Sequence, residues 1–518
     1  MNTFKRKALF TAVVAGLGVA GAGTAEAVYL NPNRAGQVLV YPYYTVQSAG
    51  GNSWNTYLSV VNTTTSAKAV KVRILEGKTS AEVLDFNLFL SPNDVWTAAI
   101  VPSGTGANDP GMILTADTSC TRPAIDPAGV LFRNFQYDTP GATADSRPGR
   151  GLERTREGYV EMIEMGRLTG TSAAFVTHTA AGVPANCAAV ADAPFDPVGN
   201  ATITPPTGGL IGTGTLINVN SGLDATYKAD ALEAWSDIVQ YTDSGVVTPN
   251  LANANPPISV VVRSGDLDPV TGASTQITAY RSEFAGGAVA SAGAQAVASV
   301  FMHNAVLNEY VLDTATGSLT DWVVTQPLKN QFVTTTVTET PYTALATTAG
   351  ACEVIGFTYF DREERTATAS GSDFSPLPPG AAANTMCWES TILAIRNGAA
   401  HTTVDTTVSP VLASRNITNV AVTGTFQNGW GRLSFTGTNA ATVGLTSLVS
   451  EIVNLGTDVG TLGGGVTVTA APATFFGLPV TGFMVRSFSN ATLTCGTAAC
   501  QGNYGGLFQH SYATTITP

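Results

Sequence analysis

The segment GTSAAFVTH (170–178) contains a serine and a histidine, two residue types that together can form a nucleophilic pair. A serine hydroxyl attacks a carbonyl carbon only when a base, most often a histidine, removes its proton. The run 174–177 has the composition of a β-strand, which would place Ser172 and His178 on one face but about 20 Å apart. We therefore expect the start of a strand and a surface histidine.

Residues 170–174 resemble the nucleophile segment of the subtilisin-like proteases. In those enzymes the aspartate and the histidine precede the serine in the chain. Here His178 is the first histidine of the sequence, and it follows Ser172. The order argues against a protease, and because no other catalytic motif is present, we expect that the protein is not an enzyme.

The segment GYVEMIEMG (158–166) offers Glu161 and Glu164, the residue type that glycosidases use in pairs. In a strand, residues three apart point to opposite faces, so these two carboxylates could not act on one sugar ring. We expect one glutamate to face solvent and the other to pair with an arginine of 147–157. A glycosidase that combines either glutamate with a distant acid is an alternative.

The segment RPGRGLERTRE (147–157) is the basic cluster of the chain after its N-terminal region. It contains four arginines interleaved with two glutamates: Arg147, Arg150, Arg154, Arg156, Glu153 and Glu157. Self-pairing of these charges predicts a solvated loop. A site for an anionic polysaccharide is the alternative.

Two acidic turns suggest calcium. GDLDPVTGAS (265–274) presents Asp266 and Asp268, and DTATGSLTD (313–321) places Asp313 and Asp321 around a turn. Calcium takes six to eight oxygen ligands, of which such a loop supplies two or three. Neither segment matches a complete calcium-binding loop, so calcium is a hypothesis beside that of plain turns between strands.

The N-terminus has the pattern of a secretory signal peptide. Basic residues 5–7 precede an apolar run, and Ala25-Glu26-Ala27 fits a cleavage site, so we expect residues 1–27 to be removed. No later stretch is long and apolar enough to span a membrane. This predicts export by the general secretory route to the cell surface or the exterior of a bacterium.

Charged residues make up only 12% of the chain, about half the usual share, and the net charge is -12. That balance argues against nucleic acid or anionic lipid as a partner. Low charge is also a solubility risk unless the surface is meant to contact other subunits.

Six cysteines fit an oxidising compartment. We predict the sequential pairing among the possible ones: Cys120–Cys187, Cys352–Cys387 and Cys495–Cys500. A metal site is disfavoured because no histidine lies near the C-x4-C spacing at Cys495.

Hydrophobic residues alternate with polar ones along most of the chain. In 68–77, for example, Val70, Val72 and Ile74 face one way while Lys71 and Arg73 face the other. The successive strands 55–64, 68–77, 83–90 and 95–101 predict an all-β protein built of antiparallel, immunoglobulin-like β-sandwich modules with long Ala/Gly/Thr-rich loops.

One short helix is expected at 227–239, with Ala229, Leu232, Trp235 and Ile238 on one stripe. The chain length and the proline-rich joints suggest several regions. We divide the chain into the signal peptide 1–27, an N-terminal β-sandwich region 28–205, a middle β region 206–345 and a C-terminal β region 346–518.

The segment GQVLVYPYYTV (36–46) is rich in tyrosine. Pro42 cannot donate to a ladder, so we expect this strand at a sheet edge or at a bulge. At an edge it could add to the sheet of another subunit, with one set of residues forming an assembly strand. These residues are Val38, Val40, Tyr41, Tyr43 and Tyr44. A first strand packed inside its own domain is the competing interpretation.

Several strings of the sequence resemble a group of exported bacterial cell-surface proteins with no defined activity. They include GQVLVYPYYTV, NTYLSVVNTT, FNLFLSPNDVWTAAIV, TREGYVEMIEMG and GLPVTGF. The resemblance implies an envelope location and brings no catalytic residues.

Together these observations predict a structural or adhesive surface protein that assembles with itself into a layer, filament or matrix. Its contacts would be strand edges and face-to-face packing of low-charge subunits. Cell-envelope polysaccharide is a second expected partner. The alternative is an extracellular carbohydrate-binding protein or polysaccharide hydrolase, for which exposed tryptophan or tyrosine in a groove would be the sign.

Overall fold

A computed structural model of the chain describes most of the sequence after the N-terminal segment. The described residues are 27–49, 51–138, 148–191, 195–264, 277–368, 384–397, 407–422, 426–435, 447–449, 461–462, 466–469, 473–495 and 498–517. The expected signal peptide, apart from Ala27, lies outside them.

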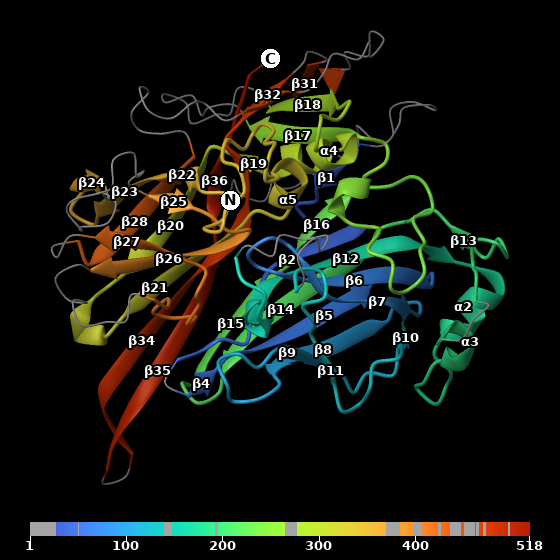
Figure 1. Cartoon of the computed structure of the whole chain (residues 1–518), viewed down its shortest axis with the longest axis horizontal. Helices are drawn as coiled ribbons and strands as arrows, with labels where there is room; N and C mark the ends of the chain where they lie inside the picture. The colour runs from blue at the N-terminus through green and yellow to red at the C-terminus, as the bar shows by residue number, and fades with distance from the viewer. Residues whose placement is uncertain are drawn as a thin grey trace.

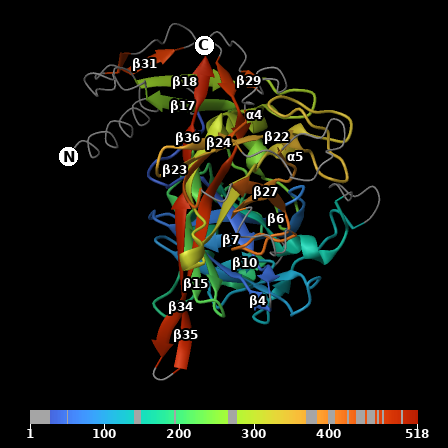
Figure 2. The same cartoon turned by 90° about the vertical axis from the view of Figure 1, so that its left-hand side faces the viewer.

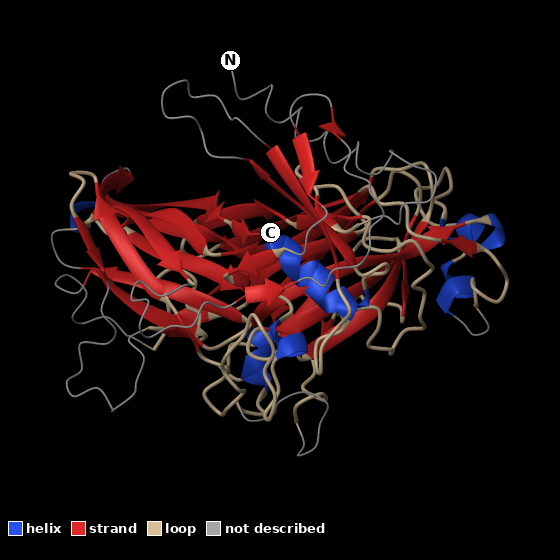
Figure 3. Ribbon diagram, turned by 90° about the horizontal axis from the view of Figure 1, so that it is seen from above, coloured by secondary structure: helices blue, strands red, loops and turns tan. Residues whose placement is uncertain are grey.

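The chain is an all-β protein, as predicted, in which strands fill the centre and short helices lie beside them (Figure 3). The longest described helix is α4 (Ala292–Phe301). The others are η1 (Leu152–Arg156), α2 (Gly170–Val176), α3 (Cys187–Ala191), η2 (Leu251–Asn253), η3 (Thr314–Thr316) and α5 (Lys329–Phe332). Among the described helices none has the length and apolarity that a membrane span requires.

Two antiparallel sheets from the first half of the chain share one apolar core. The eight-stranded sheet has the order β1 (Tyr29–Leu30), β16 (Asp230–Glu233), β2 (Val38–Thr45), β12 (Glu157–Leu168), β6 (Lys68–Glu76), β7 (Glu82–Leu90), β10 (Cys120–Arg122), with β13 (Ile203–Thr204) beside β12. The six-stranded sheet has the order β11 (Val130–Leu131), β9 (Gly111–Leu114), β8 (Val95–Pro102), β5 (Asn55–Asn62), β14 (Leu210–Asn218), β15 (Leu223–Lys228). Val72 and Phe86 of the first sheet and Leu58 and Trp96 of the second belong to the core between them.

Two further sheets come from the second half of the chain (Figure 1). The β20 sheet has the order β24 (Thr366–Thr368), β23 (Gly356–Asp361), β28 (Asn428–Ser434), β20 (Ala305–Val311), β36 (Ser511–Ala513). The β21 sheet has the order β27 (Ile417–Val422), β26 (Ser390–Asn397), β21 (Leu319–Thr325), β34 (Thr481–Cys495), β35 (Ala498–Gln509).

The β21 sheet is buried on both faces at β21 and β26. Trp322 packs in the core shared with the β20 sheet, whereas its neighbour Val323 packs in the core of the first two sheets. Because both faces need apolar side chains here, β21 and β26 each have a short continuous apolar run, 322–324 and 392–395, instead of alternation.

The remaining strands form small sheets. They are β3 (Ser48–Ala49), β4 (Asn52–Ser53), β17 (Ile258–Ser264), β18 (Ile277–Glu283), β19 (Met302–His303), β22 (Glu353–Val354), β25 (Thr385–Met386), β29 (Ser447–Val449), β30 (Thr461–Leu462), β31 (Val466–Thr469), β32 (Thr474–Phe476), β33 (Leu478–Pro479) and β37 (Thr515–Thr517).

The sheets cross the expected region boundaries. β14, β15 and β16 follow residue 205, yet they pair with strands of the first region, and β20 and β21 pair with strands beyond residue 346. The boundaries therefore fall inside sheets. Backbone hydrogen bonds between strands distant in sequence decide the grouping, and turn composition does not reveal them.

The helix expected at 227–239 is wrong. The segment is the end of β15 followed by β16, whose Leu232 pairs with Val38 of β2. Ala229, Leu232 and Trp235 are buried as expected, but Ile238 is exposed. A ladder to β2 supplies the backbone hydrogen bonds that a helix would otherwise make internally. The strand expected at 174–177 is also wrong, since this run ends helix α2.

The tyrosine-rich strand β2 is not at an edge. It lies between β16 and β12, and Val38, Val40, Tyr41, Tyr43 and Tyr44 are completely buried, so the predicted assembly strand is wrong. The expected bulge is present: Tyr41 pairs with Val160 and Tyr44 with Gly158, so Pro42 and Tyr43 together oppose Tyr159. On the other side β16 pairs only as far as Val40, so Pro42 removes no ladder hydrogen bond there.

Candidate functional site

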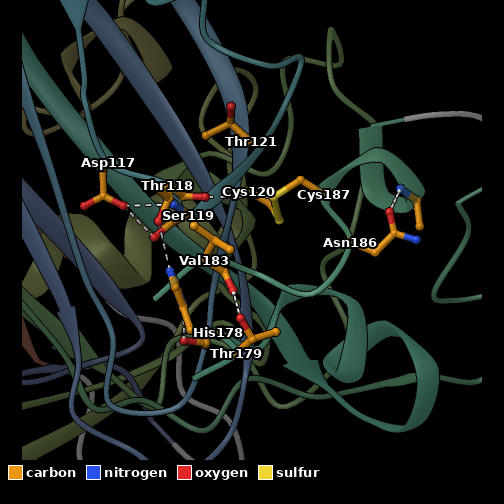
Figure 4. Close-up of a disulfide and its surroundings, with 12 residues drawn as sticks. Asp117, Thr118, Ser119, Cys120, Thr121, His178, Thr179, Val183, Asn186 and Cys187 are labelled. Carbon is orange, nitrogen blue, oxygen red and sulfur yellow. Dashed lines mark hydrogen bonds between the residues drawn. A yellow bond between two sulfur atoms is a disulfide. The ribbon is translucent and has the colours of Figure 1, made fainter. Parts of the chain in front are cut away.

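Ser172 and His178 do not meet. The Oγ of Ser172 lies 2.6 Å from Oγ1 of Thr202. His178 instead lies beside the Cys120–Cys187 disulfide (Figure 4), where its Nε2 is 3.3 Å from Oγ1 of Thr118. The argument against a protease that uses Ser172 therefore agrees with the geometry.

His178 does contact a serine and an aspartate that sequence reasoning missed. Its Nδ1 lies 2.7 Å from Oγ of Ser91 and 3.6 Å from Oδ2 of Asp94. A catalytic triad needs the serine on Nε2 and the acid on Nδ1, whereas here both approach Nδ1. Asp94 also accepts a hydrogen bond from the backbone N–H of Ser91. Through these contacts His178, which follows α2, binds the turn between β7 and β8.

Glu161 and Glu164 point to opposite faces of β12, but neither faces solvent. Glu161 accepts a hydrogen bond from Nη1 of Arg73 at 2.5 Å, and Glu164 accepts one from Nζ of Lys68 at 2.7 Å. Burial raises the pKa of both glutamates, and the two cations partly offset the increase. The partners come from β6 and not from 147–157, so that expectation is wrong.

The arginine cluster is not a solvated loop. Arg150 is exposed, but Arg154 and Arg156 are buried. Arg154 donates to Glu76, and Arg156 donates to the carbonyl oxygens of Asp109 and Val46. Arg147 lies outside the described residues. Buried guanidinium groups with internal partners cannot bind a polysaccharide, which removes two members of that alternative site.

The two calcium turns have different outcomes. Asp266 and Asp268 lie outside the described residues. Asp313 accepts a hydrogen bond from the N–H of Ala315 at the start of η3, whereas Asp321 is completely buried and accepts from Val411 and Leu412. These separate roles contradict a shared calcium site at 313–321. Within the described part of the chain, no group of three or more His, Cys, Asp or Glu is placed to hold a metal ion.

Two of the three predicted disulfides are confirmed. Cys120–Cys187 ties α3 to β10, and Cys352–Cys387 joins the segments before β22 and after β25. The third pair lies near the β34–β35 turn, where Cys495 pairs through its backbone with Ala498, and Leu493 with Cys500. That disulfide stays a prediction.

Four of the six tryptophans are in the core. Trp54, Trp96, Trp235 and Trp322 are at most 1% exposed. Trp430 is 39% exposed and stacks on Phe360 with ring centroids 4.2 Å apart. Most of the tryptophans therefore belong to the core, as expected.

The side chains that face away from the core on the six-stranded sheet form the candidate site. Three strands, β8, β5 and β14, contribute one residue each to three rows: Ala99–Tyr57–Thr215, Thr97–Ser59–Thr213 and Val95–Val61–Ile211. We call these nine residues the outer face. None is charged, and Tyr57 and Val95 are each 47% exposed. It is an apolar and hydroxyl-lined surface on a protein whose net charge is -12.

Two hollows open along this sheet. One, of about 520 Å³, includes Tyr57, Ser59, Thr97, Thr213 and Thr215 in its lining. The other, also of about 520 Å³, is lined in part by Asp117, Ser119 and the Cys120–Cys187 disulfide. Thr115, Ala116 and Pro127 line both hollows, so the two lie next to each other.

Sequence reasoning missed the outer face. The alternation in 55–64 shows that Tyr57, Ser59 and Val61 share one side of a strand. It does not show which strands flank β5, and the absence of charge is a property of all three strands together.

No protein-family model, no curated protein and no solved structure matches the chain.

Proposed function

We propose that the protein is an exported structural protein of a bacterial cell surface whose copies pack together through the outer face. The observation that carries the proposal is the set of three adjacent uncharged rows on β8, β5 and β14. The secretory pattern of residues 1–27 and the two disulfides support an oxidising, extracytoplasmic location.

Electrostatics favours this face as the contact. Copies with a net charge of -12 repel one another, and like charges brought together across an interface cost several kcal/mol. The nine residues of the outer face bring no like charges together, and the exposed charges of β15 nearest to them, Asp224 and Lys228, lie at the border of the contact. Its exposed Tyr57, Val95 and Ile211 would be removed from water, which is the main favourable term in association.

The test is self-association of a charged variant. Thr97→Lys combined with Thr213→Lys places one cation on each side of Ser59. Across a twofold axis these cations would face the same cations of the partner. Light scattering over a range of concentrations should show assembled wild-type protein and at least tenfold weaker association of the variant. Thr336→Lys, at an exposed loop position, is the matched control.

Two results would overturn the proposal. One is a wild-type protein that is monomeric at all concentrations. The other is a variant that folds, by circular dichroism, and assembles as well as the Thr336→Lys control.

The second candidate is a carbohydrate-binding protein, favoured by Tyr57 and the hydroxyl groups of Ser59, Thr97, Thr213 and Thr215 in one hollow. An exposed ring and neutral hydroxyls fit a neutral saccharide better than an anionic one. A hydrolase is disfavoured because Asp117 is the one carboxylate among the described residues that line the two hollows. Binding to neutral polysaccharide that Tyr57→Ala abolishes would favour this candidate.

A further inference from the structure

The hairpin of β34 and β35 continues beyond the sheet to which it belongs. β21 pairs with β34 from Thr481 to Ser487 only, whereas the β34–β35 ladder continues to the pair Cys495–Ala498. Figures 1 and 2 show the two strands extending past the rest of the molecule. We call residues 490–502 the ribbon.

Each strand of the ribbon has one ladder among the described residues. β34 pairs there with β35 alone, and β35 has no other strand partner. The loop after η3 reaches Ser489, and Asn503 donates to the carbonyl oxygen of Ser221, so these residues mark where the hairpin leaves the body. An isolated two-stranded hairpin is marginally stable in water, and its outer edges are templates for further strands.

The sequence of the hairpin lacks the residues that protect such edges. Soluble proteins place lysine, other charges or proline on exposed edge strands. Residues 487–509 contain no Asp, Glu, Lys, Arg or Pro. A bulge between Asn490 and Leu493 interrupts the regular ladder where the ribbon begins, and it is the kind of feature that protects an edge. Beyond it, from Leu493 to Cys495, the ladder is regular again, and among the described residues this part of the β34 edge has no strand beside it.

We infer that the edge of β34 beyond its bulge, centred on residues 493–495, pairs antiparallel with the same edge of a second copy, so that two ribbons form a four-stranded sheet. The inference rests on the self-assembly proposed above. An identical edge on both copies is self-complementary about a twofold axis, which is the commonest symmetry of protein assemblies. The uncharged sequence keeps the repulsion between two acidic copies away from the contact.

The ribbon and the outer face share no residue. Two different twofold contacts on one subunit cannot both be made within one dimer. Alternating them gives an open chain of subunits when the two axes do not intersect, and a closed ring when they do. The ribbon is then the second contact of an assembly larger than a dimer, for which we take the open chain, a filament, as the expected form.

The test replaces residues 490–502 with Asn-Gly, which joins the paired residues Ser489 and Asn503 by a two-residue hairpin turn. The control is the full-length chain with Cys495→Ser and Cys500→Ser, which removes the predicted disulfide and keeps the ribbon. Negative-stain microscopy and light scattering should show filaments for the wild type and the control, but only dimers for the shortened chain. The amides of 493–495 should exchange at least tenfold more slowly in the filament than in diluted monomer.

The outcomes separate the two proposals. Filaments from the shortened chain, or equal exchange rates in both states, would overturn the ribbon contact while leaving the outer face intact. If the Thr97→Lys, Thr213→Lys variant still forms filaments while the shortened chain does not assemble, the outer-face contact would be overturned and the ribbon contact kept. A wild-type monomer would overturn both.

Discussion

The guanidinium of Arg154 donates from Nη2 to Oε1 of Glu76 over 2.7 Å, and both side chains are completely buried. Its Nε donates to the other carboxylate oxygen at 3.1 Å, so the contact is bidentate. Glu76 also accepts the backbone N–H groups of Lys78 and Thr79. Burial alone raises the pKa of Glu76, but Arg154 and these N–H groups outweigh it and hold the pKa below its ordinary value. The pair therefore fixes η1 against the end of β6.

We expect Arg154→Met to lower the free energy of unfolding by about 3–5 kcal/mol, because it leaves the Glu76 carboxylate buried without its cation. Denaturant unfolding followed by tryptophan fluorescence measures the change. Arg362→Met is the matched control: Arg362 pairs with Glu363 on the surface, where water screens the contact, so this substitution should change the free energy of unfolding far less. Equal effects of the two substitutions would show that the buried pair has no special role.

Much of the fold class could be predicted because alternation with period two is a local signal. Val70, Val72 and Ile74 of β6 do pack in the core between the first two sheets. The same alternation suggests that Lys71 and Arg73 face solvent, yet both are buried. Leu251 and Leu328, from segments distant in sequence, line a small cavity beside Arg73. The local sequence pattern of β6 does not indicate that these segments pack over its charged face.

The candidate site was less predictable than the fold. Two disulfides followed from the order of the cysteines alone, because neighbouring pairs close the shortest loops. Pro42 suggested that β2 lies at a sheet edge, but a bulge opposite Tyr159 accommodates the missing N–H of Pro42 inside the sheet. The outer face depends on which strands pair, and the edge of the ribbon depends on where a ladder ends. Both are set by contacts between residues distant in sequence, which local patterns do not reveal.

His510 should make the protein sensitive to acid. Burial lowers its pKa to about 3, and its two ring nitrogens lie 3.0 Å from the Val323 carbonyl oxygen and 2.9 Å from Nδ2 of Asn308. In the unfolded chain the pKa is about 6.5, so between these values the unfolded state binds more protons. Stability is then lost as the pH falls below about 6.5, by roughly 3 kcal/mol between pH 7 and pH 4.

The measurement compares unfolding free energies of the wild type and His510→Gln across that range. The substitution removes the titrating group, so the variant should lose less stability on acidification even if it is less stable at pH 7. Parallel pH profiles for the two proteins would contradict the role of His510.

Asp321 gives the opposite pH dependence. Burial raises its pKa to about 6 although the N–H groups of Leu412 and Val411 lower it. Between the unfolded value of about 3.8 and pH 6 the folded state binds more protons, so stability falls as the pH rises through this window and the loss persists above it. Asp321→Asn keeps an oxygen for the two N–H groups and removes the buried charge. Relative to the wild type, the variant should gain about 3 kcal/mol of stability between pH 4 and pH 8.

The comparison across pH matters because the new amide nitrogen costs stability of its own. Oδ2 of Asp321 accepts both N–H groups, so an Asn that keeps these contacts places its Nδ2 where the second carboxylate oxygen lies, and the change in hydrogen bonding there is the same at every pH. That penalty is the same at pH 4 and pH 8 and cancels in the difference. This account would be contradicted if millimolar calcium stabilised the wild type at pH 8 but not Asp321→Asn. That result would show that the carboxylate is a calcium ligand and does not only accept the N–H groups of residues 411–412.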